Sequence, residues 1–140
     1  MENNKSDSSF CVKMRQKMIV LMKQMEIYLQ HGPSHQKFAL ANEIRNKELE
    51  IIEHIVRVEI LYHNKTALTN LNIAHEQLRA LIALWYEFGY FDYKKGKMGE
   101  NAESLTPNTK DGFKKFTYIN LMVNQIGKMI GVLLSNFVNK

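Results

Sequence analysis

Apolar residues recur every three or four positions through most of the chain, which is the spacing of an amphipathic α-helix. The first such stretch runs from about Phe10 to Gln30. One side of this helix is apolar and consists of Met14, Met18, Leu21, Met25 and Leu29. We expect the helix to end at Gly32-Pro33, because Gly terminates helices and Pro disfavours helix in the residue before it. Residues 1–9 lack the pattern and are predicted to be a flexible tail.

The same spacing predicts two further helices in the middle of the chain. One runs from about His35 to His63. The next begins at a capping Asn64 or Thr66, whose side-chain oxygen can accept a hydrogen bond from the first turn. It runs to about Phe88 and ends at Gly89.

Residues 90–110 interrupt the helical spacing and are predicted to form a long loop. Few residues of the kind that are usually buried follow Tyr93, and the segment contains Lys94, Lys95 and Lys97. The loop is therefore expected to be solvated, with a basic binding loop as the alternative.

A fourth helix is expected from about Asp111 to Val138, and it has two apolar stripes rather than one. One stripe suffices for packing in a bundle, so the second favours deep burial or a partner surface. Gly127 and Gly131 lie one turn apart and indicate close approach of another backbone, within the bundle or between subunits. The predicted oligomer interface consists of Ile119, Met122, Ile126, Gly127 and Gly131.

These elements predict an all-α fold, an antiparallel up-down four-helix bundle formed by residues 1–140 as a single domain. No alternating β-strand pattern is present. The longest unbroken apolar run, Ala80 to Tyr86, is too short to span a bilayer, and residues 1–9 contain no secretory signal. We therefore expect no membrane partner and a cytoplasmic location.

Charge gives the first indication of function, since 19 basic and 14 acidic residues leave a net charge of +5. Residues 1–31 carry +2 and residues 91–140 carry +4, whereas the middle of the chain is close to neutral. Such a balance modestly favours polyanionic partners. The candidate phosphate contacts are Lys13, Arg15, Lys17, Arg45, Arg79, Lys114, Lys115 and Lys128.

Glu48 occupies a position on the apolar face of the second helix, where a carboxylate is costly unless it is paired. The expected partner is Arg45 or Arg79, in an ion pair that joins the second and third helices. The alternative is that one of these arginines contacts phosphate.

Enzyme chemistry is not expected from the residue types present. Glu50 and His54 are four positions apart, whereas the di-iron pattern of helical bundles needs a separation of three. The single cysteine, Cys11, stands in a polar stretch and has no nucleophile signature. No glycine-rich phosphate loop follows a strand. We therefore predict no catalytic residues, no metal and no cofactor.

Three segments resemble a known family: residues 37–45 (KFALANEIR), residues 71–81 and residues 127–133 (GKMIGVL). This four-helix-bundle family has two branches. One contains the accessory variability determinant proteins (Avd) of diversity-generating retroelements, and the other contains proteins encoded by intervening sequences of bacterial 23S ribosomal RNA. The resemblance covers roughly residues 15–138. Residues 53–58 read EHIVRV where the ribosomal branch has SNIAEG, a departure that favours the retroelement branch.

The resemblance implies a homopentameric, basic barrel that binds a reverse transcriptase and template RNA, and supports cDNA synthesis without being a catalyst. DNA or an RNA–DNA hybrid is a further candidate partner. Two alternatives stay open: a bundle that binds structured ribosomal RNA, and a module that binds only protein. The family's loop before the fourth helix is shorter than residues 90–110, which leaves the partner contacts of this chain open.

Overall fold

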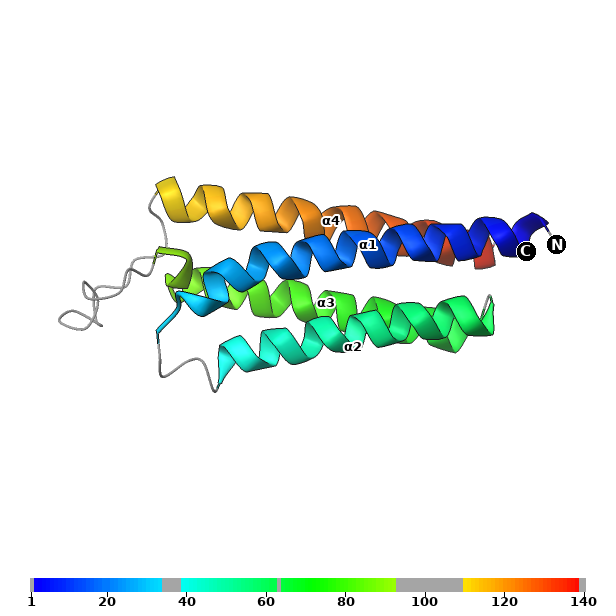
Figure 1. The fold of residues 1–140 in the computed structure, drawn as a ribbon, viewed down its shortest axis with the longest axis horizontal. Helices are drawn as coiled ribbons and strands as arrows, with labels where there is room; N and C mark the ends of the chain where they lie inside the picture. Colours follow the sequence, from blue (N-terminus) through cyan, green and yellow to red (C-terminus); the bar gives the residue numbers. More distant parts are fainter. Residues whose placement is uncertain (1, 34–38, 63, 93–109, 139–140) are drawn as a thin grey trace.

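A computed structural model describes residues 2–33, 39–62, 64–92 and 110–138. Within these ranges the chain is all-helical and contains no β-strand. The helices are α1 (Glu2–Gln30), α2 (Leu40–Leu61), α3 (Lys65–Glu87) and α4 (Lys110–Val138), with a short 3₁₀ helix, η2 (Tyr90–Asp92), between the last two. Figure 1 shows the four long helices lying side by side, with both termini at the same end. The expectation of a four-helix bundle is confirmed at this level.

Each long helix contacts two others, since α1 and α3 both pack against α2 and α4. The apolar faces meet in one core, to which every long helix contributes. Met14, Met18 and Met25 of α1 are fully buried in it, as are Ile44 and Ile51 of α2. The methionine stripe of α1 is therefore core, and burial of these faces is the main source of stability.

The helix ends follow local chemistry where the structure describes them. Of the two predicted caps, Asn64 and Thr66, it is Asn64 that caps α3, because its side chain accepts a hydrogen bond from the Ala67 N–H at 2.9 Å. Gly89 ends the helix with a φ of 76°, a backbone conformation that glycine adopts without steric cost. The predicted start of α2 at His35 lies outside the described residues, and the described helix begins at Leu40.

Two segments differ from the sequence-based expectation. α1 begins at Glu2 rather than near Phe10, so the predicted tail is largely helical; residues 2–9 contain no Pro or Gly to stop a helix. Residues 90–92 form η2 rather than loop, and Tyr90 and Phe91 are buried beside Trp85 and Tyr28. The remainder of the predicted loop, residues 93–109, lies outside the described residues.

Candidate nucleic-acid interface

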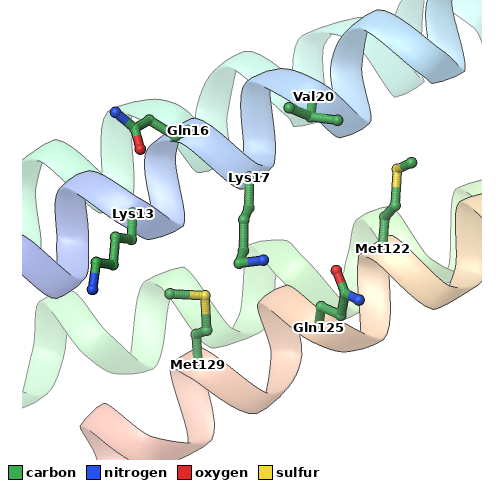
Figure 2. A pocket seen from close by; sticks show the side chains of 7 residues that line it. All are labelled: Lys13, Gln16, Lys17, Val20, Met122, Gln125 and Met129. Carbon is green, nitrogen blue, oxygen red and sulfur yellow. The ribbon is translucent and has the colours of Figure 1, made fainter.

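A groove of about 380 Å³ lies between α1 and α4. Lys13 and Lys17 of α1 point across it towards α4, and Met129 and Gln125 of α4 point back towards α1 (Figure 2). Both lysines are exposed, and they follow one another by one helical turn. The α1 side of the groove is therefore a short row of positive charge.

The rest of this groove is mainly apolar. Met122 and Met129 are half-buried and Val20 is exposed, while the side-chain amides of Gln16 and Gln125 supply neutral hydrogen-bonding groups. Among the residues that the structure describes, no carboxylate lines it. A ligand in this groove would meet cations, amides and thioethers, a combination that suits an anionic ligand with an apolar or aromatic part.

Four of the predicted phosphate contacts are exposed lysines without an ion pair among the described residues: Lys13, Lys17, Lys114 and Lys128. They do not form one patch. Lys114 lies in the first turns of α4, about 21 Å along the helix axis from Lys128. The structure thus places Lys13 and Lys17 at the α1–α4 groove, whereas Lys114 and Lys128 do not line it.

The predicted arginine contacts are engaged within the bundle. Arg15 bonds Glu59 of α2 at 3.1 Å. The Arg45 Nε atom donates to one oxygen of Glu26 at 2.9 Å, and its Nη2 atom donates to the other at 3.0 Å.

Arg79 and Lys115 are also engaged. Arg79 donates to the Asn124 side chain of α4 and lies 3.5 Å from Glu76. Lys115 pairs with Asp111 at 3.1 Å. A phosphate would have to displace these internal partners, so the unpaired lysines are the better candidates.

A second groove of about 380 Å³, between α1 and α2, contains the buried Glu48. The expected ion pair with Arg45 or Arg79 is absent from the described structure: the Arg45 side chain turns to Glu26 on α1, and the Glu48 Oε2 atom has no hydrogen-bond partner. Burial, reinforced by the negative charge of Glu26, raises the pKa of Glu48 to about 8. Glu48 is therefore mainly protonated at neutral pH.

His75 of α3 is a buried polar residue that the sequence-based prediction missed. It is 1% exposed, and its Nε2 atom lies 2.8 Å from the Val123 carbonyl of α4. Burial lowers the pKa of His75. A signal existed, because Leu71, His75 and Leu78 are spaced by four and three positions and so share a helix face.

The predicted interface residues of α4 do not share one surface. Ile119 and Ile126 are fully buried in the chain's own core, so they are not available to a second subunit in this fold. Met122 lines the α1–α4 groove. A Cβ atom at Gly127 would come within 2.9 Å of the His75 ring, whereas one at Gly131 would meet nothing within 4 Å. Gly127 thus serves packing inside the bundle, and Gly131 faces open space.

No group of three or more His, Cys, Asp or Glu side chains is arranged to hold a metal ion within the described ranges. None of the described helices is long and apolar enough to cross a membrane.

Comparison of the chain with protein-family models, with curated proteins and with solved structures gave no match.

Proposed function

We propose that this protein is a non-enzymatic accessory protein that binds nucleic acid through its phosphates. The observation that carries the proposal is the pair Lys13 and Lys17, which project into the α1–α4 groove without an ion pair among the described residues. Elsewhere on α1 the cation Arg15 is matched by an acidic residue of α2. Unmatched lysines on one side of a bundle provide the attraction that polyanions need.

The family resemblance supplies the finer part of the proposal. It suggests that the chain acts with a reverse transcriptase and template RNA or cDNA in a diversity-generating retroelement. The bundle would have antiparallel up-down topology and assemble as a cytoplasmic homopentamer. A ring of about five chains, each with a charge of +5, would concentrate positive charge on one body. Binding to structured 23S ribosomal RNA is the alternative nucleic-acid role.

The test compares two charge reversals of equal size. The groove variant is Lys13→Glu with Lys17→Glu, and the control is Lys23→Glu with Lys65→Glu, two exposed lysines outside this groove. Binding of a structured RNA is measured by fluorescence anisotropy at low and moderate salt. We expect the groove variant to lose about tenfold or more in affinity and to have a shallower salt slope, with a smaller loss for the control.

Equal losses for the two variants would show that net charge alone attracts RNA, and would remove the groove from the proposal. Failure of the wild-type protein to bind RNA at low salt would favour the module that binds only protein. That alternative rests on a specific observation, since α4 exposes Phe113, Tyr118, Leu121 and Val132. Such side chains are suited to a protein partner.

Self-association is tested separately by sedimentation velocity at micromolar concentration. If a heterologous interface closes the chains into a ring, the protein should sediment as a single species several times heavier than the 16.4 kDa chain. A clean monomer would contradict the pentamer.

A further inference from the structure

We propose that the α1–α4 groove receives an unpaired nucleotide, so that the protein prefers bulged, looped or single-stranded nucleic acid over a continuous duplex. This inference rests on the proposed function and names the kind of nucleic acid that the same site takes. It is drawn from three features of the groove: the spacing of its lysines, its thioether lining and the position of its amides.

The lysines can hold one strand. Lys13 and Lys17 are four residues apart on α1, which places them about 6 Å apart along the helix axis and on one side of the groove. Two ammonium groups in a row can contact neighbouring phosphates of one strand. Such contacts position the strand without reading its sequence.

The thioethers suit an aromatic base. Met122 and Met129 are seven residues apart on α4, so they lie on the same side of the helix and both line the groove. Figure 2 shows both side chains reaching from α4 towards α1. Sulfur makes favourable contacts with aromatic rings, and methionine adapts its shape to what it covers. Both methionines also pack against the core of the bundle, and their exposed parts leave an apolar lining that a phosphate alone would not contact.

The amide of Gln125 lies between the two methionines in sequence and, in Figure 2, extends towards Lys17. An amide offers both a donor and an acceptor, and can therefore bond the edge of a base held between the methionines. Base edges become available in this way when a nucleotide is unpaired and splayed out.

A continuous duplex cannot use these groups. Its bases are stacked and paired, and a duplex is too large to enter a groove of about 380 Å³ between two neighbouring helices. A duplex can contact the lysines by its phosphates alone. Unpaired nucleotides would gain the contacts to Met122, Met129 and Gln125 in addition, which predicts a preference for them at equal charge.

The experiment uses two RNA hairpins of matched length, one fully paired and one with a single bulged 2-aminopurine. The expected result is a bulged hairpin that binds the wild-type protein at least fivefold more tightly, with a change in 2-aminopurine fluorescence on binding. Gln125→Ala and the double variant Met122→Ala/Met129→Ala should each bring the ratio of the two affinities towards one. Leu121→Ala, an exposed residue outside the groove, is the control and should keep the wild-type ratio.

Circular dichroism melting of each variant separates a lost preference from a lost fold. Because Gln125 is exposed, Gln125→Ala is the variant that should disturb the fold less. Equal affinity of the wild-type protein for both hairpins would overturn the inference while leaving phosphate binding intact. A retained preference in folded Gln125→Ala and in the folded methionine variant would overturn it as well. Absence of binding to either hairpin at low salt would instead overturn the proposed function itself.

Discussion

The two grooves that flank α1 have the same volume, about 380 Å³, but differ in the charged residues that line them. In the groove towards α2, Arg45 is paired with Glu26, the carboxyl of Glu48 is buried, and Lys23 is an exposed cation with no ion pair among the described residues. In the groove towards α4, Lys13 and Lys17 have no acidic neighbour among the lining residues.

This difference separates charges that stabilise the bundle from charges that are available to a ligand. A guanidinium can bond both oxygens of one carboxylate, and Arg45 does so across the α1–α2 contact. A lysine on a long flexible stem without a partner contributes little to folding and keeps its charge for solvent or a polyanion. Mutations on the α2 side should therefore change stability, and mutations on the α4 side should change binding.

Replacement of Glu48 should have the largest effect on stability. Because folding raises the pKa of Glu48 from 4.5 to about 8, its contribution falls as the pH rises through 8. Glu48→Met keeps the length of the side chain and removes the unsatisfied carboxyl. We expect the free energy of unfolding to increase by roughly 1–3 kcal/mol at pH 8. The measurement is urea unfolding at pH 6.5 and pH 8.5.

The wild-type protein should lose stability between these two pH values, and Glu48→Met should lose less. This window begins at the ordinary pKa of histidine, 6.5, and burial lowers the pKa of His75 in the fold, so His75 adds a small rise in stability with pH that the wild type and Glu48→Met share. Glu53→Met, at an exposed position of the same helix, is the control and should keep the wild-type slope. A slope unchanged in Glu48→Met would show that Glu48 is already ionised in the fold.

The two glycines of α4 should respond in opposite directions to substitution by alanine. Gly131→Ala meets no atom within 4 Å and gains helix propensity, so it should stabilise by up to about 1 kcal/mol. Gly127→Ala would place its Cβ 2.9 Å from the buried His75 ring, and should destabilise by roughly 1–2 kcal/mol despite the same gain. Thermal melting of both variants measures the difference. Equal shifts would show that the His75 ring moves aside freely.

Removal of the Arg45 guanidinium tests the α2 side directly. Arg45→Met breaks both bonds to Glu26 and the bond to Asn42, and should cost about 1 kcal/mol because the pair is partly exposed. Arg45 also lowers the pKa of Glu48, so its loss should move the pH dependence of stability to higher pH. A variant as stable as the wild type, with the same pH profile, would contradict the assigned role.

Much of the fold could be predicted from the sequence, because the residues that start, end and orient each helix act locally. Asn64 acts on the first turn of α3 through its side chain, and Gly89 acts through its own backbone; the sequence predicts Gly89 as the helix end and Asn64 as one of two candidate caps. The burial of Glu48 followed from its place on an apolar face, but its lack of a partner did not. Arg45 lies one turn away and could have reached it; only the packing of α1 places Glu26 closer to the guanidinium.

The candidate site was harder to predict from the sequence, because it depends on which helices are neighbours. The sequence predicts Lys13 as a phosphate contact and Met122 as an interface residue, and periodicity cannot show that they line one groove. Periodicity also left the second stripe of α4 open between deep burial and a partner surface, and the packing of α4 places Ile126 in the core. The length and the apolar face of a helix depend on residues close together in the sequence, whereas a groove depends on which two helices pack side by side.

The smallest expected effect is the change in the free energy of unfolding when the lysines of the α1–α4 groove lose their charge. Lys13→Gln with Lys17→Gln removes two charges that have no ion-pair partner among the described residues, so the free energy of unfolding should change by less than about 0.5 kcal/mol. Arg15→Gln, two residues from each lysine, removes the 3.1 Å bond to Glu59 and should cost about 0.5–1 kcal/mol. Urea unfolding at low salt compares the two variants. A double lysine variant less stable than Arg15→Gln would show that the α4-side lysines also hold the bundle together.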